Sequence, residues 1–229
     1  MTGASSGIGA ATARALAAAG ADVAVAGRRR DRLEALGVQS VVAADLRVAA
    51  EAQGFVARAH AELGRVDLLV NCAGCLHPGL VEAGAAEEWR EMAEVNLLAA
   101  VNCSYAAIAP MREHGGGHIV NVSSVVARTP LPEWGVYAAT KAGLSAFSSA
   151  LRAELLADNI RVTLVEPGFT ETEMTAAAGI RPIVEALSAQ RGTGLLQPTD
   201  VADAILFAVT RPARMTLEEM VLRPFRAGS

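Results

Sequence analysis

A tyrosine and a lysine four residues apart, Tyr137 and Lys141, are the side chains best suited to chemistry. Residues at this spacing share one face of an α-helix, with Cβ atoms about 5–6 Å apart. A phenol with a pKa of about 10 is a poor base at neutral pH. An ammonium at about 4 Å contributes roughly 4 kcal/mol at an effective dielectric of about 20, or about three pKa units. We therefore expect Lys141 to bring the pKa of Tyr137 near neutrality, where general acid–base catalysis is most effective.

Composition supports a special role for Lys141. The chain has 20 lysine and arginine residues in total, and Lys141 is the only lysine. A lysine that survives in so arginine-rich a chain indicates a position where a guanidinium cannot replace an ammonium. The alternative is a chance pairing of Tyr137 and Lys141 on a helix face.

A glycine-rich loop before the first predicted helix is the second candidate site. Glycines let the backbone turn tightly and approach a pyrophosphate, which accepts hydrogen bonds from the free N–H groups of a helix N-terminus. The alternative is a Gly/Ser loop that only caps the helix. The loop has the sequence Thr2-Gly3-Ala4-Ser5-Ser6-Gly7-Ile8-Gly9.

The residues after the next apolar segment bear on the choice of dinucleotide. A carboxylate at this point binds the ribose 2′-hydroxyl of NAD(H), whereas this chain has Arg28 and Arg29. A guanidinium can hold a 2′-phosphate through two hydrogen bonds. The alternative is a solvated helix start, where arginine is poorly placed against the helix dipole. The sequence therefore favours NADP(H) over NAD(H), with Arg28 the better candidate and Arg29 next.

Short apolar strands alternate with helices along the whole chain. The predicted strands are 22–27, 40–44, 66–71, 118–122, 161–166 and 220–223, and the predicted helices are 7–19, 30–36, 48–63, 85–113 (interrupted near Pro110), 137–158 and 198–210. This alternation indicates right-handed βαβ units. We expect an α/β fold, a Rossmann-like doubly wound parallel sheet with helices on both faces, in a single NADP(H)-binding domain over residues 1–229. Ligands of such folds bind beyond the carboxyl ends of the strands.

In order and spacing, the motifs resemble those of the short-chain dehydrogenases/reductases over essentially the whole chain. They are Thr2-Gly3-x-x-x-Gly7-x-Gly9, Asn71-x-Ala73-Gly74, Asn96, Ser124, Tyr137-x-x-x-Lys141 and Pro167-Gly168. The resemblance implies an oxidoreductase that moves hydride between NADP(H) and a small to medium alcohol or carbonyl compound, with no metal. The cofactor carries the hydride, and the protein supplies positioning, a proton and polarisation. Segments 165–169 and 217–224 look similar to NADP-dependent hydroxy-acid dehydrogenases and aldehyde reductases.

The resemblance also implies the roles of four residues in the reaction. Tyr137 would exchange a proton with the substrate oxygen, and Ser124 would hold and polarise that oxygen, with Ser123 the less well spaced alternative. Lys141 would lower the pKa of the phenol and bind the nicotinamide ribose. Asn96 would help to anchor a water molecule of the proton relay.

A larger set of residues would hold the cofactor. The resemblance implies that Asp45 contacts the adenine, and that the loop after residue 166 orients the nicotinamide amide. The complete predicted set is Gly3, Ser5, Ser6, Gly7, Ile8, Gly9, Arg28, Arg29, Asp45, Leu46, Asn71, Ala73, Gly74, Tyr137, Lys141, Pro167, Gly168 and Thr172.

Composition excludes several other classes of protein. The net charge is −4 with no basic stripe, so nucleic-acid binding has no electrostatic footprint. No run of 18 apolar residues is present to span a membrane. The Ala-rich start lacks a positive segment and contains Arg14, unlike a signal peptide. Three cysteines form no disulfide framework, and we expect a cytoplasmic protein.

Other residues have the spacing of different chemistry. Cys72 and Cys75 form a CxxC after a strand, which would fit a redox or metal site, but they overlap the Asn71-to-Gly74 motif. The histidines His60, His77, His114 and His118 show no ligand spacing, and we interpret them as surface or turn residues. No metal site is predicted. Trp134 is expected either to touch the substrate or simply to pack.

The start of the chain departs from the family pattern. An apolar strand is expected immediately before the glycine loop, but Met1 stands where that strand would end. About five buried aliphatic residues at roughly 1.5–3 kcal/mol each would be absent, comparable to a domain's stability of about 5–15 kcal/mol. We therefore expect the first strand to be truncated in this sequence, with the true start upstream.

Two further expectations concern the pocket and the assembly. Residues 169–197, with Met174, Ile180, Ile183 and Leu187, are expected to form a mobile lid whose apolar content favours a partly apolar substrate. The resemblance implies a homodimer or homotetramer in which helices 85–113 and 137–158 pair into a four-helix bundle. The rival hypotheses are a non-catalytic nucleotide-binding or regulatory protein on the same fold, and a CxxC redox protein.

Overall fold

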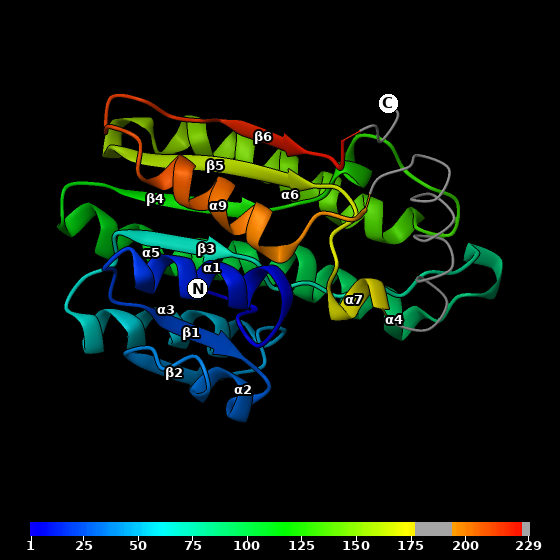
Figure 1. Cartoon of the computed structure of the whole chain (residues 1–229), viewed down its shortest axis with the longest axis horizontal. Helices are drawn as coiled ribbons and strands as arrows, with labels where there is room; N and C mark the ends of the chain where they lie inside the picture. Colours follow the sequence, from blue (N-terminus) through cyan, green and yellow to red (C-terminus); the bar gives the residue numbers. More distant parts are fainter. Residues whose placement is uncertain (177–193, 226–229) are drawn as a thin grey trace.

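The six strands found in the described part of the chain all run parallel, as the alternating pattern predicted. The computed structural model describes residues 1–176 and 194–225. One sheet pairs β1 (Ala24–Gly27) with β2 (Ser40–Ala43). The other has the order β3 (Leu68–Asn71), β4 (Gly117–Val122), β5 (Ile160–Pro167) and β6 (Glu219–Leu222). Figure 1 shows the strands pointing toward the end of the molecule where α4 and α7 lie.

The first residues of the chain connect the two sheets. Thr2 forms a parallel bridge with Ala26, and its N–H donates to the carbonyl of Val70 at 3.0 Å. The backbone at Thr2 therefore lies between β1 and β3. Beside it is a cavity of about 370 Å³, lined by Met1 and by residues of β1, β3 and α3.

Helices cover both faces of the sheets (Figure 1). On one face, α1 (Gly7–Ala18) and α9 (Pro198–Val209) share a buried cluster with the central strands. On the other, α3 (Ala49–Leu63) and α5 (Ala99–Glu113) pack against β3, β4 and β5, and α6 (Gly135–Glu154) contributes to the same core. Short helices are α2 (Arg30–Glu34), α4 (Ala86–Ala93) and α7 (Glu173–Ala176). The structure thus has the expected α/β architecture.

Local sequence explains where several helices end. α1 is rich in alanine, the residue with the highest helix propensity, and stops just before Gly20, whose φ is +90°. α3 ends at Gly64, which adopts a left-handed φ of 79°. α9 begins with Pro198 at its first turn and with a capping box between Gln197 and Asp200. These signals account for helix boundaries close to the predicted ones.

The long helix predicted over 85–113 is interrupted, but not at Pro110. α5 continues through Pro110 to Glu113. The break is a one-turn π-helical segment, Glu94–Leu98, between α4 and α5. Single π turns of this kind are often found at functional sites, and this one contains Asn96.

The helical stretch Ala86–Glu113 is long and apolar enough, by length and composition alone, to cross a membrane. Its most apolar 18-residue window has a mean hydropathy of 1.3, and 39% of that window is buried inside the protein. The buried residues of α5, among them Cys103, Ala107 and Met111, belong to the core formed with α3 and the sheet. This packing accounts for the apolar composition of the helix.

One histidine departs from the expected surface location. His118 lies on β4 and is 3% exposed. Its Nε2 lies 2.8 Å from the hydroxyl of Thr163, which itself donates to the carbonyl of Leu217, so Nε2 carries the proton. Nδ1 is buried without a hydrogen-bond partner. Burial, helped by the charge of Arg161, lowers the pKa of His118 to about 4.

We expect His118 to make the protein acid-sensitive. Because the folded pKa of about 4 lies below the ordinary histidine value of 6.5, protonation favours the unfolded chain, and stability falls as the pH drops through this window. Between pH 7 and 5 the loss attributable to this group is about 2 kcal/mol. Urea unfolding at both pH values measures it. His118→Gln should remove this part of the loss, whereas His114→Gln, at an exposed position, should leave it unchanged. Equal losses in all three proteins would refute the assignment.

Candidate active site

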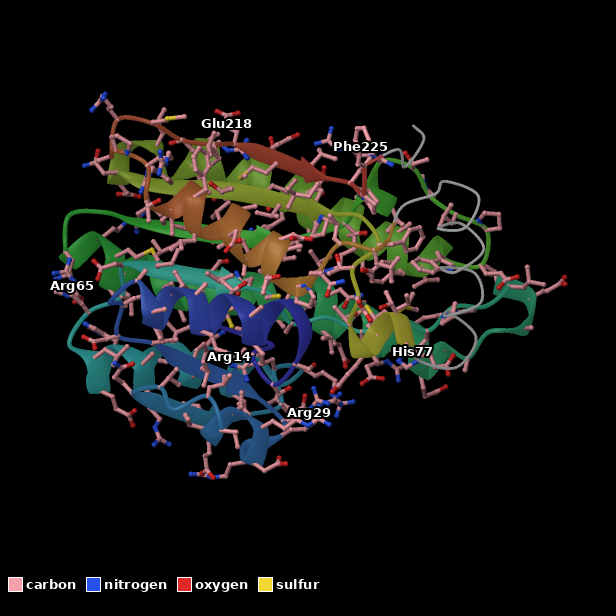
Figure 2. All side chains as sticks on the ribbon, in the orientation of Figure 1. Arg14, Arg29, Arg65, His77, Glu218 and Phe225 are labelled. Atoms are coloured by element: carbon pink, nitrogen blue, oxygen red, sulfur yellow. The ribbon has the colours of Figure 1, made fainter. Side chains whose placement is uncertain are left out.

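A pocket lies beyond the carboxyl ends of the strands, where the fold predicts ligand binding. Its volume is about 690 Å³. Of the predicted catalytic and cofactor-binding residues, all except Asn71 and Asn96 line it. Figure 2 shows Arg29 and His77 at this end of the molecule and Arg65 at the opposite end.

Tyr137 is 7% exposed in the first turn of α6 and reaches the pocket wall. The expected lowering of its pKa is not found in this structure. Burial raises the pKa of Tyr137 to about 12, and interaction with the Ser124 hydroxyl offsets only part of this rise. Spacing alone predicted the proximity of the ammonium but not the depth of burial, which disfavours the phenolate.

Lys141 lies on the same face of α6 as Tyr137, as the spacing predicted. Its Nζ is 5.8 Å from the centroid of the Tyr137 ring and donates to the carbonyl of Val122 at 3.0 Å. Burial lowers the pKa of Lys141 to about 8. A Cβ added at Gly74 would lie 3.6 Å from this Nζ, in ordinary van der Waals contact.

Two serines follow β4, and their hydroxyls have different surroundings. The Ser123 hydroxyl donates to the carbonyl of Lys141 at 2.9 Å and lies 3.1 Å from the Ser145 hydroxyl. Ser124 makes only long contacts, accepting from the Val126 N–H at 3.4 Å and donating to the Pro167 carbonyl at 3.5 Å. Both serines line the pocket, but the Ser124 hydroxyl is the more available for a ligand.

Asn96 lies behind the pocket wall and connects two of the segments that form it. It is 1% exposed, accepts from the Cys75 N–H at 2.8 Å and donates to the Cys75 carbonyl at 3.0 Å. Its Nδ2 also donates to the Thr140 hydroxyl at 3.1 Å, and that hydroxyl donates to the Tyr137 carbonyl at 2.7 Å. The π-helical turn therefore joins the loop after β3 to the first turn of α6.

Asn71 has a structural environment and does not line the pocket. Its Nδ2 donates to Asn121 Oδ1 at 2.9 Å and to the Ser104 hydroxyl at 3.1 Å. These bonds connect β3 with β4 and α5. The Asn71 Oδ1 is buried without a partner.

The glycine loop packs so closely that larger residues do not fit. Gly3 has a φ of +68°, and a Cβ there would lie 2.7 Å from the backbone of Ala73. A Cβ at Gly9 would lie 2.2 Å from the Gly3 carbonyl oxygen, and one at Gly7 would lie 3.1 Å from the Thr172 side chain. The N-terminus of α1 has no side-chain cap and no acidic residue in its first turn. Its N–H groups therefore remain available for an anion.

Both arginines after β1 line the pocket. Arg29 lies against the glycine loop, where its Nη2 donates to the hydroxyls of Ser5 at 2.9 Å and Ser6 at 2.7 Å. Its Nη1 also pairs with Glu173 of α7 at 2.6 Å. Arg28 is 63% exposed and lies 3.4 Å from a carboxylate oxygen of Glu91. Arg28 is thus the freer of the two guanidinium groups.

Asp45 and Leu46 follow β2 at the edge of the pocket. The carboxylate of Asp45 pairs with Arg47, with Nε at 3.0 Å from Oδ1 and Nη2 at 2.5 Å from Oδ2. The hydrogen bond from Arg47 lowers the pKa of Asp45. Leu46 is buried and contributes an apolar contact to this side of the pocket.

The loop after β5 closes another side of the pocket. The Gly168 N–H donates to the Leu222 carbonyl at 2.7 Å, which fixes the loop to β6. The Thr172 N–H donates to the Thr175 hydroxyl at 2.9 Å. Of the expected lid, Met174 lines the pocket, whereas Ile180, Ile183 and Leu187 lie outside the described residues.

Trp134 both packs and lines the pocket. It is 4% exposed, and its ring makes edge-to-face contacts with Tyr137 at 6.0 Å and Phe169 at 5.8 Å between centroids. Both alternatives expected for this residue are therefore compatible with its position.

Three residues in or around the pocket were not predicted from the sequence. Glu91 and Glu173 bring carboxylates to the two arginines, and Thr140 connects Asn96 to α6. Thr140 lies between Tyr137 and Lys141 in the sequence, but no signal marked Glu91 or Glu173, because their arginine partners are 63 and 144 residues away.

Comparisons with known proteins agree with this geometry. The chain matches the profile of the short chain dehydrogenases over residues 1–181. It is 36% identical over 232 residues to glycine betaine reductase of Emericella nidulans, with 98% of this chain but 18% of that protein covered. It is 36% identical to 2,3-dihydro-2,3-dihydroxybenzoate dehydrogenase of Bacillus subtilis, with 93% of this chain and 88% of that protein covered.

Two solved structures are similar over nearly their whole length. A 3-ketoacyl-(acyl-carrier-protein) reductase from Brucella melitensis, complexed with NADH, superposes with a TM-score of 0.88 at 29% identity, covering 99% of this chain and 96% of that one. A metagenomic short-chain oxidoreductase in complex with NADP gives a TM-score of 0.81 at 30% identity, covering 97% and 94%. The chain therefore belongs to the short-chain dehydrogenase/reductase family of oxidoreductases.

Proposed function

We propose that this protein is an NADP(H)-dependent oxidoreductase acting on a small to medium alcohol or carbonyl compound. The observation that carries the proposal is the meeting of Ser124, Tyr137 and Lys141 in one pocket with the glycine loop and two arginines. In this proposal residues 1–229 act as one cofactor-binding domain.

The residues present fit a nicotinamide dinucleotide phosphate. The uncapped N-terminus of α1 offers N–H groups to a pyrophosphate, and the backbone approach at Gly3 and Gly9 leaves no room for side chains. Arg28 and Arg29 supply cations where NAD(H) binding would favour a carboxylate. When bound, the cofactor supplies or accepts the hydride.

The protein's own contribution is a proton and its placement. A Tyr137 pKa of about 12 keeps the phenol protonated at neutral pH, so it can donate a proton to an oxygen that gains negative charge. The Ser124 hydroxyl would hold that oxygen by a hydrogen bond. Lys141 keeps its charge below a pKa of about 8, and that charge favours release of the phenol proton. This arrangement supports the direction of carbonyl reduction at neutral pH.

Part of the pocket lining is apolar. Leu76, Leu131, Trp134, Phe169 and Met174 line it. Such a surface favours a partly apolar substrate, because burying it against an apolar group removes both from water. The similar proteins named as a reductase and a dehydrogenase support a carbonyl/alcohol pair.

Titration with NADPH and, separately, NADH, followed by cofactor fluorescence, tests the proposal first. Tight binding of NADPH and turnover of a carbonyl panel are expected. Binding without turnover would instead support the alternative, a non-catalytic nucleotide-binding or regulatory protein on the same fold. Binding of neither cofactor would refute the proposal.

We expect Arg28→Ala to weaken NADPH binding on the order of 10–100-fold, because a charged hydrogen bond is worth about 1.5–3 kcal/mol. NADH binding should change little, since it has no 2′-phosphate. The fluorescence titration measures both. Arg30→Ala is the matched control, because Arg30 pairs with Glu34 on the exposed surface and does not line the pocket. A parallel loss of NADH affinity would contradict the role given to Arg28.

An assembly and a location complete the proposal. We propose a homodimer or homotetramer built on the long helices, with the exposed Leu98 and Tyr105 near and on α5 as apolar contact positions. A cytoplasmic location is consistent with the free thiols of Cys72, Cys75 and Cys103.

A further inference from the structure

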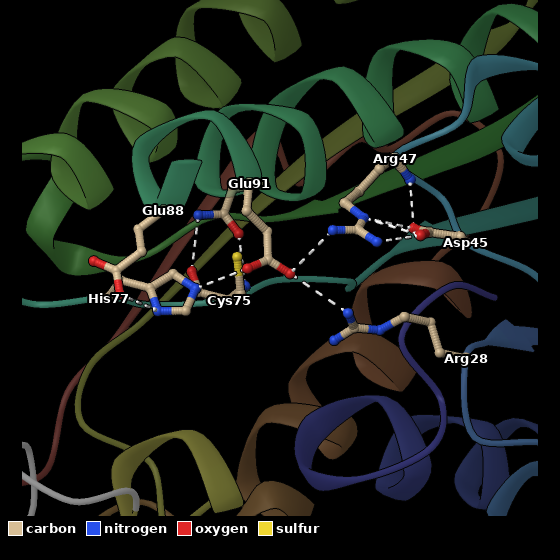
Figure 3. A network of polar contacts seen from close by, with 8 residues as sticks. Arg28, Asp45, Arg47, Cys75, His77, Glu88 and Glu91 are labelled. Carbon is tan, nitrogen blue, oxygen red and sulfur yellow. Dashed lines mark hydrogen bonds and ion pairs between the residues drawn. The ribbon is translucent and has the colours of Figure 1, made fainter. Parts of the chain in front are cut away.

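Three potential metal ligands meet on the rim of the pocket, at the end of the loop after β3. Within residues 1–176 and 194–225, the ligand atoms of Cys75, His77 and Glu91 all lie within 4.8 Å of one another. The loop supplies the thiol and the imidazole, and α4 supplies the carboxylate (Figure 3). His77 and Glu91 side chains are 33% and 23% exposed, so an ion could enter from solvent.

The spacing of these atoms suits a small divalent cation. His77 Nε2 lies 3.0 Å from Glu91 Oε2. In a tetrahedral zinc site, with bonds of about 2.0–2.3 Å, ligand atoms are about 3.3–3.7 Å apart. The three side chains therefore need only small rotations to surround one ion.

Neighbouring groups surround the ligands. Glu88 Oε1 lies 3.9 Å from His77 Nδ1, at ion-pair distance but too far for a hydrogen bond, and Nε2 faces Glu91. A carboxylate on the far nitrogen is the usual partner of a metal-binding histidine. The backbone of Cys75 is fixed on both sides by Asn96.

The Glu91 carboxylate divides its two oxygens between different partners (Figure 3). Oε1 faces Arg28 at 3.4 Å and Arg47 at 3.7 Å. Oε2 faces His77. One oxygen is thus free to bind an ion while the other remains paired with the arginines.

We propose that Cys75, His77 and Glu91 form a zinc site, with a water molecule as the fourth ligand. One sulfur, one nitrogen and one oxygen ligand favour Zn²⁺ over Mg²⁺ or Ca²⁺, which prefer oxygen ligands alone. Zinc binds the thiolate form of cysteine, so binding releases the proton of the Cys75 thiol. Cys72, the other cysteine of the CxxC sequence, is not part of the cluster.

The site differs from the function proposed above and does not depend on it. Cys75 and Arg28 both line the pocket, and Glu91 connects them. Zinc would neutralise the Glu91 charge that Arg28 now meets. The ion would thereby weaken the electrostatic attraction between Glu91 and the Arg28 guanidinium at the cofactor pocket. It would take no part in hydride transfer.

Calorimetric titration of the whole chain with zinc chloride tests the site, and a parallel titration with cobalt chloride gives a spectroscopic reading. We expect one Zn²⁺ per chain, proton release seen as a buffer-dependent enthalpy, and a thiolate-to-cobalt charge-transfer band. Cys75→Ser should abolish the band. His77→Gln should weaken zinc binding by more than the roughly 10–100-fold expected of Glu88→Gln, which removes only an outer partner.

His114→Gln, at an exposed histidine away from the cluster, is the matched control and should bind zinc as the parent does. Thermal melts without metal show whether each variant is folded. Unchanged zinc affinity in both folded His77→Gln and Cys75→Ser, or a cobalt spectrum without a thiolate band, would overturn the proposal. The NADPH titration is independent of these results, so failure of the zinc site and failure of the proposed function are distinguishable.

Discussion

Replacing Tyr137 by Phe is expected to lower turnover by about 100–10,000-fold, the range for loss of a general acid. The substitution removes one hydroxyl and keeps the ring that packs edge-to-face on Trp134. The melting temperature and the affinity for NADPH should therefore stay close to those of the parent. Steady-state kinetics with the best substrate of the carbonyl panel, together with the fluorescence titration, measures the two effects separately.

Tyr105→Phe is the matched control for this experiment. The chain has two tyrosines, and Tyr105 is 69% exposed on α5, outside the pocket. The control should retain full turnover. If Tyr137→Phe keeps a comparable turnover, the proton comes from another group, and the role assigned to this phenol is wrong.

Residue spacing and the family resemblance together predicted most of the side chains that meet in the pocket, with Asn71 and Asn96 as exceptions. Tyr137 and Lys141 share a helix face because of the helical repeat, and Ser124 joins them because it follows a parallel strand. The glycine loop and the arginines after β1 lie at the same end for the same reason. Periodicity and strand polarity therefore account for most of the candidate site.

The electrostatic state of the pocket could not be predicted in the same way. Spacing brings Lys141 to Tyr137, but packing by α6 and its neighbours removes both from water. Burial moves the pKa of the phenol up and that of the ammonium down. The expected lowering of the Tyr137 pKa failed because desolvation depends on tertiary packing, which no local pattern records.

Local sequence patterns also could not predict contacts between segments that are distant in the sequence. The π-helical turn at Asn96 looks like ordinary helix in the sequence, and Pro110 was the more obvious place for a break. His77 showed no ligand spacing among the histidines, because its partners are a cysteine two residues earlier and a glutamate on another element. Such sites become visible only when the loop after β3 is placed against α4.

Gly9→Ala is expected to destabilise the protein by about 3 kcal/mol, at the upper end of the cost of overpacking. The added Cβ would lie 2.2 Å from the Gly3 oxygen and 3.0 Å from Ala4 Cα, and both are backbone atoms that cannot rotate away. Urea unfolding measures the change. Gly54→Ala is the control, because nothing lies within 4 Å of its Cβ position in α3, and alanine there should stabilise the helix by up to about 1 kcal/mol.

The same substitution should also weaken NADPH binding. Gly3 lies close to the backbone of Ala73, since a Cβ built on Gly3 would be only 2.7 Å from it, so displacing Gly3 moves the loop against the turn after β3. Both segments line the pocket. Since the two losses have one cause, they should appear together in Gly9→Ala and be absent from Gly54→Ala. A stable Gly9→Ala protein with parental NADPH affinity would show that the loop can shift without affecting the cofactor site.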